Sequence, residues 1–205
     1  LGAEQHGFIA SVGFELYSQM LAEEINARKK EMQGESQPEA QPVNTQLDLA
    51  IDAYLPPEYI YDSIQKIEIY KKVVGCATLE DVADLLDEMV DRFGDPPKAV
   101  LNLLAVARMR VYGRNYGIES IQRRGDEVVL KFDGSRSADV QPEKLKAMES
   151  QFQGRLVSSW AESQLTVRLK TRGLDEDAML ALVEQFLIQY KEVLKSKGEL
   201  QDVAP

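Results

Sequence analysis

The spacing of apolar residues divides this chain into a separate N-terminal helix, a linker and a larger domain. Within residues 1–32, apolar side chains from Phe8 onward return every three or four positions, the period of a helix with one buried side. Residues 33–46, QGESQPEAQPVNTQ, have no such period and are rich in Pro, Gln, Ser and Glu, which predicts a flexible linker. The expected domain covers residues 47–197, and residues 198–205 are expected to be a frayed tail.

The start of this domain is predicted to be a strand followed by a helix. Leu47–Tyr54, LDLAIDAY, alternates apolar and polar residues as a half-buried strand does. Asp62 is expected to cap the N-terminus of a helix that runs to Val74 and is closed by Gly75. The residues expected to face inward are Ile64, Ile67, Tyr70 and Val74.

The stretch from Cys76 to Asp95, CATLEDVADLLDEMVDRFGD, predicts an acidic amphipathic helix. Thr78 and Asp81 have the spacing of a capping box, and Gly94 is expected to end the helix. The stretch carries seven acidic residues and a single Arg. The apolar side is expected to bury Val82, Leu85, Leu86, Met89, Val90 and Phe93.

The rest of the domain is predicted to hold three further helices and two hairpins. The helices are expected from Pro96 to about Asn115, from Pro142 to Phe152 and from Asp175 to about Lys195. The first of these is expected to face inward with Val100, Leu103, Leu104, Ala107 and Val111. The hairpins are expected to pair Ile118–Arg123 with Glu127–Phe132, and Leu156–Trp160 with Leu165–Lys170. Helices and hairpins without regular βαβ alternation indicate the α+β class, with one strand and two hairpins forming a small antiparallel sheet packed with about five helices.

Composition argues against several classes of chemistry. The chain has one His, His6, and one Cys, Cys76, which cannot form a zinc site or an internal disulfide. It contains no GxxxxGK[ST] or GxGxxG motif that would hold a phosphate. We therefore expect no catalytic residues, no metal and no cofactor in this chain. The single Cys is typical of a reducing cytoplasm, no apolar run is long enough to cross a bilayer, and the lack of an initial Met suggests a fragment.

Charge is unevenly distributed along a chain whose net charge is −10. The acidic helix contrasts with the stretch from Lys98 to Arg124, where six basic residues accompany one acid, Glu119. This polarity is typical of a domain that docks on other proteins, and equally of an ordinary solvated surface. An alternative is contact with nucleic acid, although the net charge does not favour it. That contact would use Arg108, Arg110, Arg114, Arg123 and Arg124.

Three segments resemble the C-terminal part of bacterial transcription-repair coupling factors, the Mfd translocases. They are LGAEQHGFIASVGFELYSQMLAEEI, LDLAIDAYLPPEYIYDSIQKIEIYKKV and LLDEMVDRFGDPPKAVLNLLAVARMRVYGRNYGIESI. The resemblance implies a non-catalytic regulatory domain whose parent is a DNA translocase that uses ATP and Mg, acts on stalled RNA polymerase and recruits UvrA. In that family the C-terminal domain docks on a UvrB-like module of the same protein and masks the UvrA-binding surface.

The resemblance also implies roles for individual residues. Glu88, Asp91 and Arg92 match the family's charged contact with the UvrB-like module, and their i, i+3, i+4 spacing places them on one helix face. Gln5 matches the glutamine of the family's translocation loop, whose motor is missing here. DNA would be reached only through the parent motor, and no membrane is expected. The alternative for the triplet is a solvated face with an internal Asp–Arg pair.

Overall fold

A computed structural model describes residues 45–194, which fall into two compact units. The first unit contains residues 50–111, and the second contains residues 45–49 and 112–194. The predicted N-terminal helix, Gln5, nearly all of the predicted linker and the predicted tail lie outside the described residues. The division of the chain into residues 1–32, 33–46, 47–197 and 198–205 therefore stays a prediction.

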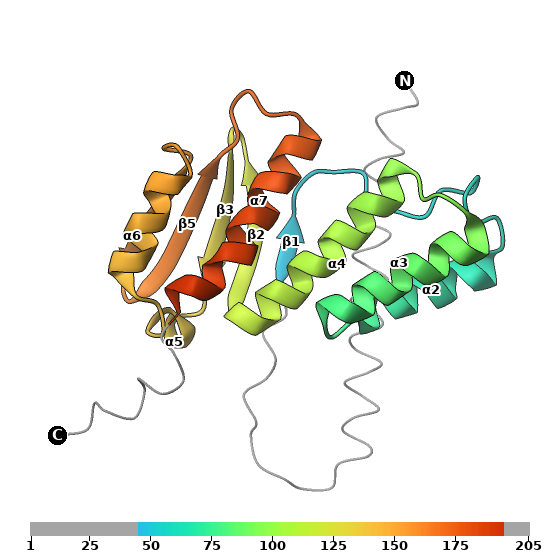
Figure 1. The fold of residues 1–205 in the computed structure, drawn as a ribbon, viewed down its shortest axis with the longest axis horizontal. Helices are drawn as coiled ribbons and strands as arrows, with labels where there is room; N and C mark the ends of the chain where they lie inside the picture. Colours follow the sequence, from blue (N-terminus) through green and yellow to red (C-terminus); the bar gives the residue numbers. More distant parts are fainter. Residues whose placement is uncertain (1–44, 195–205) are drawn as a thin grey trace, which may run out of the picture. The chain divides into compact units, whose positions relative to one another are not determined.

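The first unit contains the helices α2 (Ser63–Gly75), α3 (Leu79–Phe93) and most of α4 (Lys98–Tyr116), which the ribbon in Figure 1 shows in green. Asp62 caps α2, as predicted, because its side chain accepts a hydrogen bond from the backbone N–H of Gln65 at 2.8 Å. The predicted capping box of α3 is also present. Thr78 Oγ1 accepts from the N–H of Asp81, and Asp81 Oδ2 accepts from the N–H of Thr78 at 2.9 Å.

The predicted inner side of α2 is wrong for Ile64 and Ile67, whereas Tyr70 and Val74 are half-buried. Ile64 and Ile67 are 78% and 44% exposed, whereas Ile69 and Val73 are buried. Apolar residues occur around much of this helix, so periodicity alone does not choose the side that packs. Tyr70 connects α2 to the loop before it, because its hydroxyl accepts a hydrogen bond from the backbone N–H of Leu55 at 2.9 Å.

The inner sides of α3 and α4 agree better with prediction. Val82, Leu85 and Met89 of α3 are buried, while Leu86 and Phe93 are half-buried and Val90 is exposed. In α4 every predicted inward residue is buried, namely Val100, Leu103, Leu104, Ala107 and Val111. A loop is tied to α4 within the same unit, because Asn102 Nδ2 donates to the Asp52 carbonyl at 2.8 Å.

The second unit is built on a five-stranded sheet in the order β1-β2-β3-β5-β4. The two predicted hairpins are present, with strands β2 (Ile118–Arg124), β3 (Glu127–Phe132), β4 (Leu156–Ala161) and β5 (Gln164–Lys170) paired in antiparallel fashion. Strand β1 (Gln46–Asp48) adds to β2 in parallel, so the sheet is not wholly antiparallel. The predicted strand Leu47–Tyr54 ends early, because Ala50 has a φ of 51° and breaks the extended backbone.

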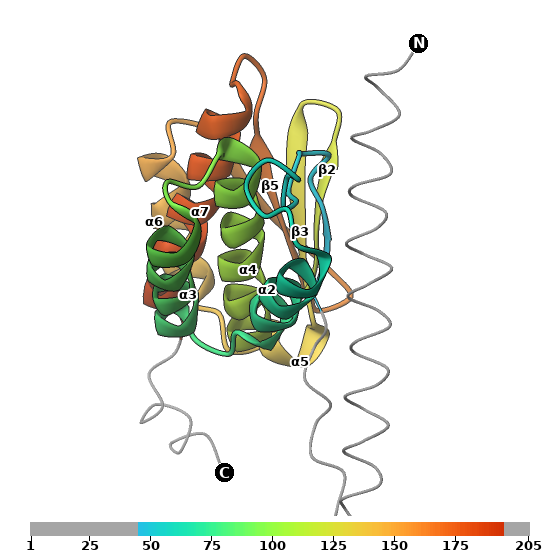
Figure 2. The ribbon, with the colours of Figure 1, turned by 90° about the vertical axis from the view of Figure 1, so that its right-hand side faces the viewer.

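Helices α6 (Pro142–Gln151) and α7 (Glu176–Tyr190) lie on one face of this sheet (Figures 1 and 2). Two shorter elements, α5 (Gly134–Ser137) and the 3-10 turn η1 (Lys191–Val193), complete the unit. Alternate residues of β5 point into the core, and Tyr190 packs its ring 4.8 Å from Phe132 and 5.4 Å from Phe186. One strand, two hairpins and the surrounding helices confirm the predicted α+β class.

Candidate partner-binding surface

The three residues singled out for partner binding lie in the second half of α3, on its outer side. Met89 and Leu85 fix the inner side of the helix in the core, and the capping box fixes its start. Glu88 and Arg92 are one helical turn apart, and Arg92 Nη1 donates to Glu88 Oε1 at 2.5 Å. The local sequence thus holds this pair in register before any partner arrives.

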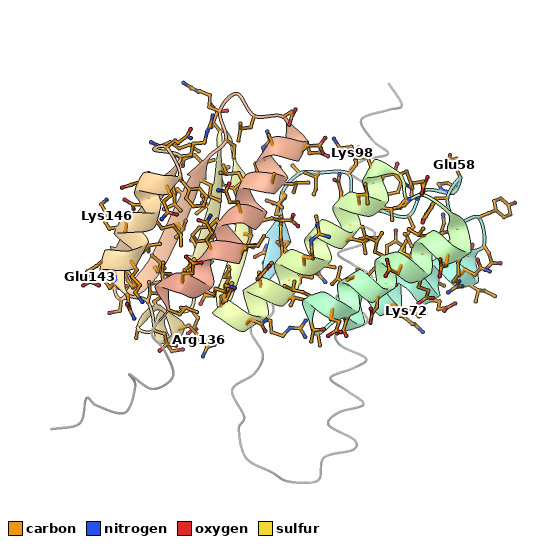
Figure 3. The ribbon with its side chains drawn as sticks, viewed as in Figure 1. Glu58, Lys72, Lys98, Arg136, Glu143 and Lys146 are labelled. Atoms are coloured by element: carbon orange, nitrogen blue, oxygen red, sulfur yellow. The ribbon has the colours of Figure 1, made fainter. Side chains whose placement is uncertain are left out.

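Glu88 and Arg92 belong to a four-residue ion-pair network that joins α3 to α2. Lys72 Nζ lies 2.6 Å from Glu88 Oε1 and 3.3 Å from Glu68 Oε1, and Figure 3 labels Lys72 beside the two helices. Arg92 Nη1 lies 3.2 Å from Glu68 Oε1, which closes the network. Two cations and two anions therefore alternate across the junction of α2 and α3, and each charge meets opposite charges on both helices.

The network shifts the pKa values of its members in the directions that favour the charged forms. Hydrogen bonds from Lys72 and then Arg92 lower the pKa of Glu88, and those from Arg92 and then Lys72 lower the pKa of Glu68. The hydrogen bond to Glu88 raises the pKa of Lys72. All four side chains keep contact with solvent, so water screens these pairs and their main effect is to fix geometry.

Aromatic contacts anchor the C-terminal end of α3 below this network. The guanidinium of Arg92 lies 4.9 Å from the centre of the Phe93 ring, and Phe93 packs edge to face against Tyr59 at 5.9 Å. The Tyr59 hydroxyl lies 2.9 Å from the Gly94 carbonyl, so it satisfies a carbonyl where the helix ends. Burial, followed by the charge of Asp95, raises the pKa of Tyr59. The anchored end keeps Arg92 in place.

Asp91 stands apart from the network on the solvent side of α3. Asp84 and Asp87 precede it by seven and four positions, so the three carboxylates share one exposed face. Within residues 45–194, no hydrogen bond or ion pair engages the Asp91 side chain. The predicted triplet therefore divides into a paired couple, Glu88 and Arg92, and a solvated carboxylate.

Sequence reasoning missed Glu68 and Lys72, which complete the network. Their i, i+4 spacing on α2 was visible in the sequence and is typical of a helix-surface pair. Their pairing with α3 depends on which side of α2 packs, and that side was predicted wrongly. The alternative of an internal Asp–Arg pair is replaced by a Glu88–Arg92 pair.

The arginines of the nucleic-acid alternative are divided between the two units, Arg108 and Arg110 in the first and Arg114, Arg123 and Arg124 in the second. Arg108 and Arg110 are two positions apart on α4, a spacing that turns their side chains to different sides of the helix. Arg123 and Arg124 are neighbours on β2 and point to opposite faces of the sheet, and Arg124 Nη2 donates to Gln122 at 2.9 Å. Arg114 is exposed in the last turn of α4. These placements give no observation that favours the alternative.

Among residues 45–194, no group of three or more His, Cys, Asp or Glu side chains is arranged to hold a metal ion. The helices within the same residues include none with the length and apolar character needed to span a membrane.

Comparison with known proteins finds similar sequences in bacterial repair factors. Residues 49–145 match the family model described as the TRCF domain. The transcription-repair-coupling factor of Bacillus subtilis (strain 168) is 40% identical over 195 residues, which are 95% of this chain and 16% of that protein. The factor of Staphylococcus aureus (strain USA300) is 40% identical over 145 residues, which are 71% of this chain and 12% of that protein. The chain therefore spans only a small part of the relatives it matches.

A solved structure is similar over the described fold. It is a crystal structure of the C-terminal domain of a transcription-repair coupling factor, with a TM-score of 0.67 and 25% sequence identity. The match covers 75% of this chain and 96% of that one. The likeness extends over nearly the whole of that domain, whereas the longer relatives contain much sequence outside the match.

Proposed function

Because the chain belongs to the transcription-repair-coupling factor family and carries its C-terminal domain, we propose that it is a non-catalytic regulatory domain that docks on a UvrB-like module of its own parent protein. Docking would cover the surface by which that module binds UvrA, so the domain would hold the parent in an autoinhibited state. Cofactor chemistry, ATP and Mg included, would belong to the parent's motor. DNA and RNA polymerase would be reached through other parts of the parent, in the cytoplasm and without membrane contact.

The observation that best supports this proposal is the pre-formed charged surface on α2 and α3. Glu88 and Arg92 are held by Lys72 and Glu68, so a partner meets side chains that are already ordered and loses little conformational entropy on binding. Arg92 directs both of its Nη atoms at the Glu68 carboxylate, at 3.2 and 3.5 Å, whereas Asp91 is free to meet a cation on the partner. Exposed charge pairs set register and encounter rate more than affinity, which suits a contact that must open.

A binding titration between this chain and the separately expressed UvrB-like module tests the proposal. Substitution of the three surface residues, Glu88→Ala/Asp91→Ala/Arg92→Ala, should weaken docking about tenfold or more, within the range seen for interface charges. The effect should shrink as salt rises, because exposed pairs are screened. Equal affinity of the variant and the wild type would contradict the proposed contact.

A matched control comes from α6 in the second unit. Glu143 and Lys144 are exposed charged neighbours on that helix, and Figure 3 labels Glu143. The substitution Glu143→Ala/Lys144→Ala should leave docking unchanged. Equal weakening by both sets would indicate that the loss of exposed charged side chains anywhere on the chain weakens docking, and would contradict a specific surface.

A further inference from the structure

Three large apolar side chains lie uncovered along one edge of α2. Tyr61, Ile64 and Ile67 are 92%, 78% and 44% exposed. Ile64 and Ile67 are three residues apart on α2, and Tyr61 lies directly before the helix cap, Asp62. The opposite side of α2 already supplies the core through Ile69 and Val73, which are buried. We call the three residues the α2 stripe. Packing within the first unit does not bury these three side chains.

The α2 stripe is continuous with the ion-pair network. Ile64, Glu68 and Lys72 are four residues apart in succession, so they form one line along α2. Glu68 is bound to Arg92 and Lys72 is bound to Glu88, which fixes that line against α3. A single surface of α2 thus passes from apolar side chains at its N-terminal end to ordered charges at its C-terminal end. An apolar centre next to a polar rim is the usual composition of a protein interface.

Charge on the neighbouring helix indicates what kind of surface would cover the stripe. The solvent side of α3 carries Asp84, Asp87 and Asp91, all exposed. A second copy of this chain related by a two-fold axis would set the same patch against itself and bring these carboxylates together, which is unfavourable. A surface with an apolar patch bordered by Lys or Arg side chains would be complementary instead.

We propose that the α2 stripe is the apolar centre of the docking surface and that its occupant is an apolar patch with a basic border on the partner protein. This inference rests on the proposed function, since it assigns that patch to the UvrB-like module. Glu88, Asp91 and Arg92 then form one charged edge of the contact, and Tyr61 and Ile64 supply buried area. Exposed apolar residues that become desolvated at an interface are the ones that dominate affinity.

The test is the affinity of the full 205-residue chain for the UvrB-like module after Ile64→Ser. Removal of a side chain that becomes buried on binding should raise the dissociation constant about tenfold or more. The loss should change little with salt, unlike the loss caused by the charged substitutions. The matched control is Ile188→Ser on α7, because Ile188 is also a helical isoleucine and is 52% exposed. This control should bind as the wild type does.

The possible outcomes separate this inference from the proposed function. If Ile64→Ser binds like Ile188→Ser while Glu88→Ala/Asp91→Ala/Arg92→Ala binds weakly, the stripe is not part of the contact and the proposed function stands. If the wild-type chain does not bind the module, both fail. Sedimentation velocity adds one more outcome, since a wild-type dimer that Ile64→Ser converts to a monomer would identify a second copy as the occupant and overturn the inference. Tyr61→Ser repeats the test outside the helix should Ile64→Ser alter the fold.

Discussion

Met89 offers the sharpest test of the claim that α3 separates folding from docking. Its side chain is fully buried on the inner side of the helix, directly after Glu88 on the outer side. Met89→Ala removes three buried heavy atoms, worth roughly 2.5 kcal/mol in transfer free energy at about 0.8 kcal/mol per group. The cavity left behind raises the expected loss toward about 3–4 kcal/mol, within the range seen for Met→Ala in cores.

Urea unfolding followed by far-UV circular dichroism measures this loss. With a slope of about 1–3 kcal/mol/M, the unfolding midpoint of Met89→Ala should fall by roughly 1–4 M. Below the transition, where the chain is still folded, its affinity for the UvrB-like module should stay near the wild-type value, because Met89 reaches no partner.

Asp91→Ala is the matched change on the solvent side of the same helix. It should leave the unfolding midpoint in place and weaken docking, the reverse of Met89→Ala. A loss of less than about 0.5 kcal/mol for Met89→Ala would refute the packing described here, since surface substitutions usually have effects of that size. A large loss of stability for Asp91→Ala would refute the division of α3 into two functional sides.

Three further predictions concern stability. The Tyr190 hydroxyl is buried and has no hydrogen-bond partner among the described residues. Tyr190→Phe should therefore raise the free energy of unfolding, measured by urea titration, by about 1 kcal/mol. A decrease in that free energy would show that the hydroxyl is hydrogen-bonded. Gly113 leaves no room for a β-carbon, which would lie 2.8 Å from Cβ and Cγ2 of Thr45. Gly113→Ala should therefore lower the free energy of unfolding by about 1–3 kcal/mol and lower the melting temperature. An unchanged melting temperature would contradict this close contact. The lowered pKa values of Glu68 and Glu88 mean that the network stabilises the fold above their ordinary pKa of 4.5 and loses this contribution as the pH falls through their folded values. Urea midpoints at about pH 7 and about pH 3 should therefore differ less in Lys72→Gln/Arg92→Gln than in the wild type, and an equal difference would mean that the network does not stabilise the fold.

Elements with strong local signals could be predicted from the sequence. The ends of α3 follow from Thr78, Asp81 and Gly94, which act through neighbouring backbone groups and need no tertiary partner. The two hairpins follow from alternating runs separated by short polar turns. Local chemistry decides these features, so the sequence alone is sufficient.

Elements that depend on tertiary packing could not be predicted in the same way. The choice between Ile64 and Ile69 as the inner residue of α2 depends on what lies against the helix, and both positions are apolar. The early end of β1 depends on the unusual φ of Ala50, a residue type that gives no warning of it. The wrong side of α2 also concealed the roles of Glu68 and Lys72. The sequence therefore indicated the two α3 members of the ion-pair network, Glu88 and Arg92, but not their two partners on α2.

We propose that Glu88, Asp91 and Arg92 hold the parent factor in a state that cannot bind UvrA. The most direct measurement is UvrA association by the full-length parent protein carrying Glu88→Ala/Asp91→Ala/Arg92→Ala, with Glu143→Ala/Lys144→Ala as the control. Release of the domain predicts that UvrA binds the first variant more tightly than it binds the wild type or the control. UvrA association equal to that of the wild type would contradict the claim.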